Sequence, residues 1–228
     1  MTWVFDNLDL IVQLSIEHLR QSAIAVVMGF MLSIPLGFAA WRFRLLRGAV
    51  TTVTGILYTI PSLALLMLLP AAFGYPAFSD INLVIALTLY AIAVLVRSVV
   101  DGLDAVDPGV RAASTAVGYS ASRRFFAVEL PLAAPVILAG LRVTAASTIS
   151  LATVGILVGV PNLGYLFTNG LERRIIPEVL TGVLAVIVLA LLIDAILVIT
   201  GRVLMPWARP RRSADLPTAE SGTWRVAT

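Results

Sequence analysis

The sequence predicts an all-α membrane protein, a bundle of five transmembrane helices. Of its 228 residues, 59% are hydrophobic and 13% are charged, whereas soluble domains typically carry about 25% charged residues. A helix that crosses a bilayer needs about 20 mostly apolar residues, and five segments meet this requirement. They are residues 20–41, 48–70, 81–100, 133–159 and 178–201.

The five segments differ in the polar and helix-breaking residues that they contain. The first and third are the apolar runs "RQSAIAVVMGFMLSIPLGFAAW" and "INLVIALTLYAIAVLVRSVV", the second contains Pro61, the fourth begins after Pro131, and the fifth contains Asp194. Residues 1–19 mix apolar and acidic positions, and we expect an interfacial segment there on the outer face. Residues 205–228 are polar and contain several prolines and arginines, so we expect a disordered cytoplasmic tail.

The distribution of arginine between the connecting loops orients the bundle. The loop between spans one and two, the loop between spans three and four with its flanks, and the C-terminal tail together hold twelve arginines, whereas the opposite side holds three. Because cytoplasmic loops carry the excess of arginine and lysine, the N-terminus is expected outside and the C-terminus in the cytoplasm. Residues 20–204 then form the transmembrane domain, with 101–132 as a cytoplasmic loop.

Several kinds of chemistry are excluded by what the sequence lacks. It has no cysteine and a single histidine, His18, which excludes disulfides, thiolate chemistry and a metal site built on several histidines. No G-x-x-x-x-G-K-[ST] loop is present to hold ATP phosphates, and neither H-E-x-x-H nor G-x-S-x-G is present. We therefore expect no enzyme and no metal or nucleotide site in this chain, and nothing indicates a nucleic-acid partner.

The cytoplasmic loop 101–132 is patterned as two short helices joined by a glycine. Asp107, which precedes a proline, favours the start of a helix, and Gly118 favours its end. Ser120 favours the start of a second short helix that ends before Pro131. The loop is therefore expected to be an ordered element that lies along the cytoplasmic face of the membrane.

The side chains of this element suggest how it would be used. Arg123 and Arg124 are expected at the lipid headgroups, at the start of the second helix. The small side chains of Ala112, Ala113 and Ser114 would let another protein approach the first helix closely. Alternatively, the alanines only favour helicity on a surface helix.

The element resembles the EAA loop of ABC importer permease subunits, which runs Glu-Ala-Ala, three residues, Gly, and further on Leu-Pro. This chain has Ala112-Ala113-Ser114, Gly118 and Leu130-Pro131, with a matching interval from glycine to proline. Ala112 stands where the family has Glu, which removes a charge that could hold the loop or contact a partner. The stretches "YTIPSLALL", "SIPLGFAA", "VELPLAAPVILAGLRVTA" and "NLGYL" are similar to permeases of the glycine betaine/carnitine/choline/proline osmoprotectant branch.

The resemblance implies a type I ABC importer permease-like bundle in the cell membrane of a bacterium or archaeon. The chain would form the pathway for a compatible solute such as glycine betaine, choline, carnitine or proline. Its partners would be an ABC ATPase that binds the ATP and magnesium, an extracytoplasmic solute-binding protein, and a second copy or a related permease. Alternatives are import of another small amine or amino-acid-like solute and, less consistent with the patterned loop, a stand-alone channel or secondary carrier.

Four positions and one charged pair inside the membrane are candidates for a role in transport. Arg142 and Asp194 lie at matched depth in the fourth and fifth spans, so we expect an ion pair between them, with direct contact to solute as the alternative. Pro61 and Ser62 mark a bend, either a packing kink or part of the pathway near a gate. Gly155 and Gly159 lie at the outer end of the fourth span, where they allow close helix contact or form an outer gate.

Overall fold

The computed structural model describes residues 2–208, and within that range every regular element is helical. Four helical segments are long and apolar enough to cross a membrane, and a bent pair of helices makes a fifth span if it is counted as one. The expected all-α bundle is confirmed. The elements are α1 (Thr2–Asp6), α2 (Leu8–Arg42), α3 (Arg44–Thr59), α4 (Ser62–Phe73), α5 (Asp80–Asp104), α6 (Pro108–Ala116), α7 (Ala121–Arg124), a π-helical turn (Phe125–Glu129), α8 (Leu130–Ala152), a 3-10 helix (Thr153–Val158), α9 (Gly164–Glu172), α10 (Ile176–Leu204) and a final 3-10 turn (Pro206–Ala208).

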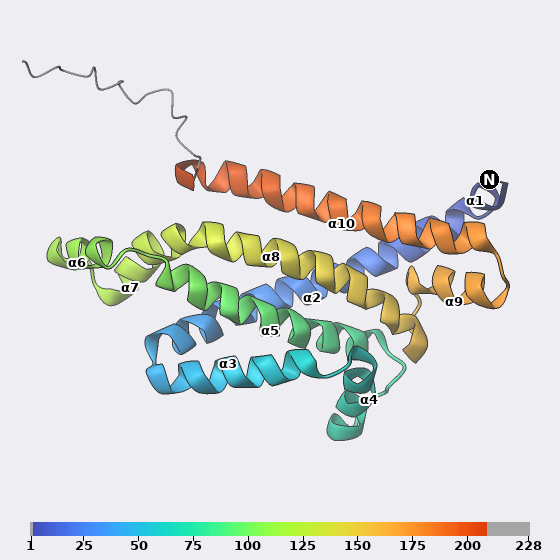
Figure 1. The fold of residues 1–228 in the computed structure, drawn as a ribbon, viewed down its shortest axis with the longest axis horizontal. Coiled ribbons are helices and arrows are strands. Elements are labelled where there is room, and N and C mark those ends of the chain that lie inside the picture. Colours follow the sequence, from blue (N-terminus) through green and yellow to red (C-terminus); the bar gives the residue numbers. More distant parts are fainter. Residues whose placement is uncertain (1, 209–228) are drawn as a thin grey trace, which may run out of the picture.

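Helix α5 lies at the centre of the bundle (Figure 1). Its most extensive contacts are with α2 and α8, and apolar side chains such as Leu95, Val96 and Val99 are fully buried along it. Helix α3 packs on one side of α5, and α10 lies beyond α8 on the other side (Figure 1). Helices α6 and α7 project from one end of the bundle, whereas α1 and α9 lie at the opposite end.

Glycines bring α2 and α5 into backbone contact. A Cβ atom added at Gly29 would lie 2.5 Å from the Cβ of Ala91, and one added at Gly37 would lie 2.6 Å from the Cβ of Val99. In lipid, helices associate through close van der Waals packing of small residues, because the acyl chains are as apolar as the helices. Helices α2 and α5 therefore form a tightly packed pair, and α8 and α3 pack against this pair.

Helix α2 is longer than the first expected span. It runs without interruption from Leu8 to Arg42, and only α1 precedes it. The segment before residue 20 is thus mostly a continuation of the span and not a separate element. One face of this continuation is buried, including Leu14 and His18, whereas Asp9 is exposed.

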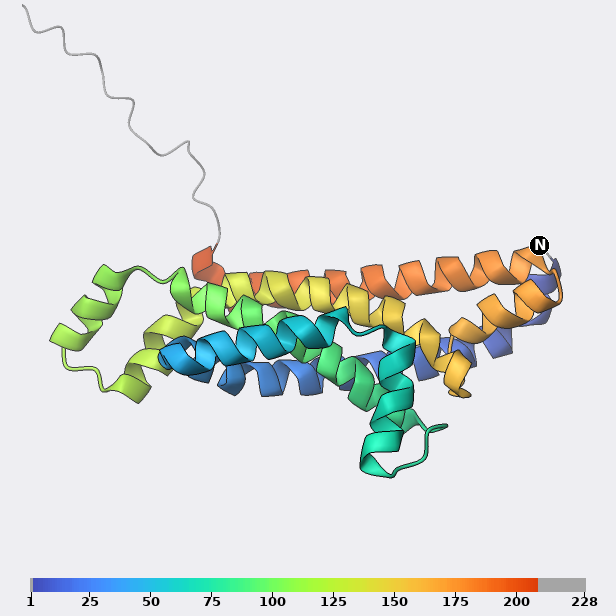
Figure 2. The ribbon, with the colours of Figure 1, turned by 60° about the horizontal axis from the view of Figure 1, so that its bottom comes forward.

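Pro61 interrupts the second expected span, and the bend there is much larger than the bend of a kinked helix. Helix α3 ends at Thr59, α4 begins at Ser62, and the two axes are bent by 110°. Proline lacks a backbone N–H and disfavours helical backbone in the residue before it, and Ile60 is accordingly extended. The Tyr90 hydroxyl donates a hydrogen bond to the carbonyl of Ile60. Helix α4 therefore turns sharply from the direction of α3 (Figure 2), while its Leu65, Leu66 and Leu69 remain packed in the core of the bundle.

The second short cytoplasmic helix does not end before Pro131, contrary to expectation. Helices α7 and α8 join through the π-helical turn, in which the Leu130 N–H bonds to the carbonyl of Phe125. A π turn has one residue more than an α turn, and it carries the chain past a proline that cannot donate. Helix α8 then continues through Pro135 to Ala152. Most of the expected disordered tail, residues 209–228, lies outside the described residues.

Candidate coupling element and membrane pathway

The projecting element α6–α7 is ordered by local caps at each end. Asp107 Oδ1 accepts the N–H of Gly109 at 2.5 Å, and Gly118 has the left-handed φ of +91° that ends α6. The Tyr119 N–H bonds back to the Ser114 carbonyl at 3.1 Å, which closes the glycine turn. Ser120 Oγ then accepts the N–H of Arg123 at 3.4 Å and caps α7. The helix–glycine–helix plan expected from the sequence is present.

The exposed face of α6 differs from the one expected. Ala112 and Ala113 are exposed, but Ser114 is buried and its hydroxyl donates to the Arg111 carbonyl at 2.8 Å. Ser114 therefore faces the body of the protein. Val110 and Val117 are exposed on either side of Ala113, at the spacing of one helix face. The exposed apolar face of α6 consists of Val110, Ala113 and Val117.

A buried carboxylate fastens α6 to the bundle. Glu129, in the π-helical turn, has a side chain that is 2% exposed, and its Oε1 lies 3.0 Å from Arg124 Nε and 3.6 Å from Arg111 Nε. Arg124 also donates to Thr115 Oγ1 at 2.8 Å. Since a buried carboxylate is strongly disfavoured unless it is paired, this ion cluster (Glu129, Arg111 and Arg124) holds α6, α7 and the start of α8 in one arrangement.

Arg111 extends the ion cluster to two further helices. Its guanidinium lies over the Trp41 ring, 4.8 Å from the ring centroid, and it donates to the carbonyl of Leu103 near the end of α5. Trp41 lies near the end of α2. A displacement of α6 would therefore act directly on α2, α5 and α8.

Sequence reasoning missed the ion cluster. Glu129, Arg111 and Trp41 were not among the expected site residues, and Arg124 was expected at lipid headgroups, whereas it turns inward to Glu129. One signal was available: Glu129 is the only charge in the run "FFAVELPLAAP" that opens the fourth span. An isolated acid in such a run needs a cationic partner.

Arg142 and Asp194 meet between α8 and α10. Arg142 Nε lies 2.6 Å from Asp194 Oδ1, and Arg142 Nη2 lies 2.9 Å from Asp194 Oδ2. A bidentate pair of this kind occupies both carboxylate oxygens and fixes the relative orientation of the two side chains. The geometry is that of a link between α8 and α10.

A polar groove runs between α3 and α5. It encloses about 530 Å³ and is lined by Thr54, Gly55, Tyr58, Thr59, Ala93, Val94, Arg97 and Ser98. The Arg97 guanidinium lies across α3, where it donates to the Thr51 carbonyl at 3.3 Å. A Cβ atom at Gly55 would lie 2.8 Å from Arg97 Nη2, so the glycine makes room for the guanidinium. Within residues 2–208, no carboxylate lies within ion-pair distance of Arg97.

The four positions considered as pathway or gate fall in two places. Pro61 is exposed and Ser62 is half-buried. Both lie at the break between α3 and α4, directly after the part of α3 that lines the polar groove. Gly155 is buried, and a Cβ atom there would lie 2.5 Å from Leu83 Cδ2; Gly159 has a φ of +70° and faces Phe78. The two glycines serve close packing and chain reversal, and neither lines the polar groove.

A buried polar network fixes the extracytoplasmic end of the bundle. Asn162 Nδ2 donates to the Ala152 carbonyl at 2.8 Å and to Gln21 Oε1 at 3.2 Å, and Gln21 Nε2 donates to Asp80 Oδ1 at 3.1 Å. His18 Nε2 lies 2.8 Å from the Ile149 carbonyl. Buried polar groups of this kind specify one arrangement of the elements that they join. The network ties α2, α5 and α8 together at the end opposite to α6.

We expect Asp194→Asn to lower the melting temperature of the protein, because it leaves the Arg142 guanidinium without its counterion inside the membrane. Thermal unfolding in nanodiscs measures this effect. Arg142→Gln combined with Asp194→Asn removes both charges and should be more stable than the Asp194→Asn single variant. A double variant whose loss equals the sum of the two single losses would argue against a direct pair.

The chain resembles known membrane transport proteins over most of its length. The family described as "Binding-protein-dependent transport system inner membrane component" matches residues 18–210. The osmoprotectant import permease protein OsmW of Salmonella typhimurium is 31% identical over 197 residues, which cover 86% of this chain and 92% of that protein. The glycine betaine/carnitine/choline transport system permease protein OpuCB of Bacillus subtilis is 32% identical over 192 residues, covering 83% of this chain and 86% of that protein.

Solved structures with the same fold include chains of ABC transporters. A chain of the MetNI methionine ABC transporter in an inward-facing conformation superposes with a TM-score of 0.75 at 20% identity, covering 90% of this chain and 99% of that chain. A chain of an amino acid ABC transporter with histidines superposes with a TM-score of 0.72 at 18% identity, covering 88% and 97% of the two chains. The chain therefore belongs to the family of binding-protein-dependent transport system inner membrane components, the permease subunits of ABC importers.

Proposed function

We propose that the chain forms the translocation pathway of an ATP-driven importer for a compatible solute such as glycine betaine, choline, carnitine or proline. The relatives that match most of the chain are named for osmoprotectant, glycine betaine, carnitine and choline transport. The observation that carries the mechanism is the ion cluster, because it links a projecting helix to three spans. Such a link is required if energy enters the protein from outside the membrane.

The partner that supplies this energy is an ABC ATPase, which binds the ATP and magnesium. Its docking site on this chain is the apolar face of α6, formed by Val110, Ala113 and Val117. Residues at this spacing form one face of a helix and can enter a hydrophobic groove. When ATP binding closes the ATPase, the displacement of α6 passes through the ion cluster to α2, α5 and α8.

The solute pathway lies at the polar groove between α3 and α5. Within residues 2–208 the Arg97 guanidinium has no carboxylate partner. An arginine without a counterion is costly in hydrocarbon and faces protein or a water-filled cavity, so we infer that this side of the bundle faces the pathway and not the lipid. The other wall is a second copy of the chain or a related permease. Pro61 and Ser62 lie where α3 breaks, which makes that break a hinge for a gate, whereas the contacts of Gly155 and Gly159 favour close packing over a part in the gate.

The opposite end of the bundle receives the solute from an extracytoplasmic solute-binding protein. The network around Asn162 and Gln21 holds this end rigid, which suits a surface that must be recognised by a partner. A permease of this family that imports another small amine or amino-acid-like solute is the second candidate, since the solved structures with this fold include methionine and amino acid transporters.

Reconstitution with the ATPase and the binding protein in proteoliposomes should give uptake of a radiolabelled compatible solute only when all three components and ATP are present. Glycine betaine, choline, carnitine and proline are supplied separately, and calorimetry on the binding protein identifies the solute that it delivers. Uptake by this chain alone would contradict the importer and favour a channel or secondary carrier. Binding of an unrelated amino acid in place of all four solutes would favour the second candidate.

Glu129→Gln should lower solute uptake about tenfold while the basal ATPase activity of the assembled complex persists, because the variant loosens the link between α6 and the spans. Uptake and ATP hydrolysis are measured on the same proteoliposomes, and size-exclusion chromatography checks assembly. Asp104→Asn is the matched control, since Asp104 pairs with Arg47 at the exposed cytoplasmic surface, where ion pairs contribute little. Equal effects of the two substitutions on uptake would contradict the role of the ion cluster.

A further inference from the structure

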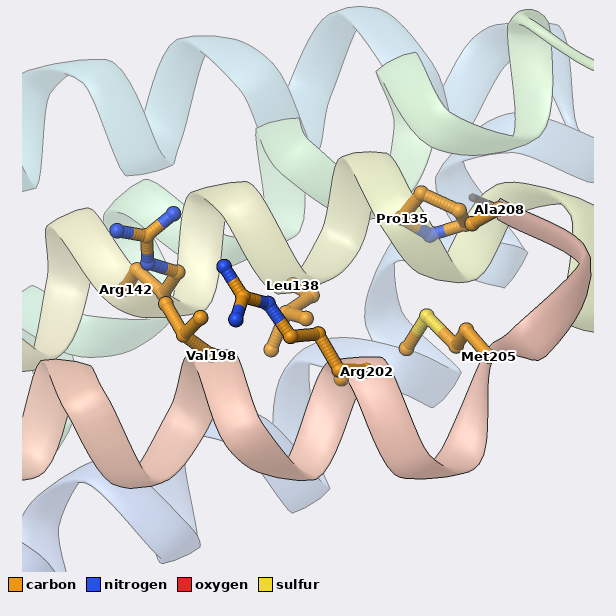
Figure 3. A pocket seen from close by; sticks show the side chains of 8 residues that line it. Pro135, Leu138, Arg142, Val198, Arg202, Met205 and Ala208 are labelled. Atoms are coloured by element: carbon orange, nitrogen blue, oxygen red, sulfur yellow. The ribbon is translucent and has the colours of Figure 1, made fainter. Parts of the chain in front are cut away.

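Arg97 is the charged residue among those that line the polar groove between α3 and α5. The lining includes no acid, and within residues 2–208 no carboxylate lies within ion-pair distance of Arg97. Arg142, by contrast, lies between α8 and α10 (Figure 3), where both of its contacting nitrogens are taken up by Asp194. The groove therefore carries a positive charge that the described part of the chain does not balance.

The guanidinium of Arg97 is positioned by α3 but not saturated by it. Arg97 Nη2 donates to the Thr51 carbonyl at 3.3 Å, which is the hydrogen bond that residues 2–208 provide for this side chain. An arginine has five N–H donors in a planar fork that matches a carboxylate. The hydroxyls of Thr54 and Thr59, in the same groove, donate to carbonyls of their own helix. Arg97 is thus the strongest donor that the groove offers to a solute.

The guanidinium lies above the level of the cytoplasmic headgroups. Helices α3 and α5 run antiparallel (Figure 1), and the exposed pair of Arg47 with Asp104 joins their cytoplasmic ends. The guanidinium lies against Thr51 and Gly55. These residues follow Arg47 by four and eight positions, or about 6 and 12 Å along the helix. A charge at this depth suits a water-filled groove better than a headgroup contact.

An aromatic ring lies one helical turn from the guanidinium. Tyr58 lines the same groove three residues beyond Gly55, a rise of about 4.5 Å along α3. Its ring meets the ring of Tyr90 edge to face, with the centroids 6.3 Å apart. Tyr90 is buried and bonded to the Ile60 carbonyl, so it steadies Tyr58. The Tyr58 side chain is still 54% exposed, and a cation binds favourably over the face of such a ring.

The two side chains together are complementary to a zwitterion and not to a simple cation. A solute with a carboxylate close to a substituted ammonium can place the carboxylate at Arg97 and the ammonium against Tyr58. A cation without a carboxylate would gain the ring contact but would be repelled by the guanidinium. The groove encloses about 530 Å³, which lies in the range of small-molecule sites, about 300–1,000 Å³.

We propose that Arg97 and Tyr58 form a binding site in the pathway for solutes that carry both a carboxylate and a substituted ammonium, and that this site selects against choline. The proposal rests on the proposed function, in which the groove belongs to the pathway. Glycine betaine, carnitine and proline all carry the carboxylate that choline lacks. A phospholipid phosphate is the other anionic group that could reach an arginine in a membrane protein, and the experiment tests it separately.

The experiment measures solute binding to the transporter assembled with its ATPase in phosphatidylcholine nanodiscs. Thr59→Cys places a single cysteine in the groove, since the chain has no other, and a bound solute slows its labelling by a maleimide. Mass spectrometry of this chain measures the labelling, and uptake in proteoliposomes checks that each variant is assembled. We expect glycine betaine to protect the cysteine, choline to protect it little, and added phosphatidylglycerol to have no effect.

Substitutions in the Thr59→Cys background test the two side chains. Arg97→Gln should raise the glycine betaine concentration for half protection about tenfold, because a charge-assisted hydrogen bond is lost, and Arg97→Lys should have a smaller effect. Tyr58→Leu should raise it about threefold, whereas Tyr58→Phe keeps the ring and should leave it nearly unchanged. Arg44→Gln, at the exposed cytoplasmic end of α3, is the matched control and should have no effect.

Four results would overturn the selection by Arg97 and leave the pathway in the groove intact. They are equal protection by choline and glycine betaine, no protection by either solute, protection by glycine betaine that persists in Arg97→Gln, and protection by phosphatidylglycerol in place of the solute. A different result would contradict the proposed pathway itself. It is the absence of labelling at Thr59→Cys in a transporter that still imports solute, because the groove would then be closed to water.

Discussion

The pairing of the buried Glu129 carboxylate with Arg111 and Arg124 is the interaction on which the rest of the account depends. Without it, α6 would be joined to the bundle chiefly by its two flanking turns, and a force applied to α6 would be lost in their flexibility. With it, α6 is linked to the ends of α2 and α5 and to the start of α8. A buried ion pair is seldom a large source of net stability. Its value here lies in fixing one geometry, which is what a mechanical link requires.

The two ends of the bundle are built for different tasks. At the extracytoplasmic end, Gln21 and Asn162 join α2, α5 and α8 through hydrogen bonds from their side-chain amides to a backbone carbonyl, to each other and to the Asp80 carboxylate. Between the ends, glycines in α2 allow the backbone of α5 to approach closely, so the two helices move as one body. In the proposed mechanism, motion would be concentrated where the packing is interrupted, at the 110° break around Pro61 and at the polar groove beside it. In this arrangement the α2–α5 pair stays rigid, and the α3–α4 segment bends at Pro61. A displacement of α6 could then change access to the pathway through that one segment.

Rules based on neighbouring residues, such as helix caps and helical spacing, predicted most of the helices. They failed for features whose geometry depends on contacts with other parts of the protein. Caps at Asp107 and Gly118 act within a few residues, and the fixed rise of a helix was enough to set Arg142 level with Asp194. By contrast, the sequence indicates that Pro61 interrupts a helix but not by how much, because the angle depends on α5, whose Tyr90 holds the Ile60 carbonyl. The inward orientation of Ser114 and the pairing of Arg124 with Glu129 were also missed, because helix patterns and caps do not specify which way a side chain turns. The missing family glutamate at Ala112 directed attention to the exposed face of α6, whereas the acid that fixes the element lies 17 residues further along the chain.

The central claim is that force enters the protein through the face of α6 that carries Val110, Ala113 and Val117. The chain has no cysteine, so single cysteines can be introduced and cross-linked to the ATPase without background. Cross-linking of Ala113→Cys and of Ser114→Cys to cysteines in the groove of the ATPase is the most direct measurement. We expect an efficient, ATP-sensitive cross-link from the exposed position 113 and little cross-linking from the buried position 114. Equal cross-linking from both positions, or none from any position of α6, would contradict it.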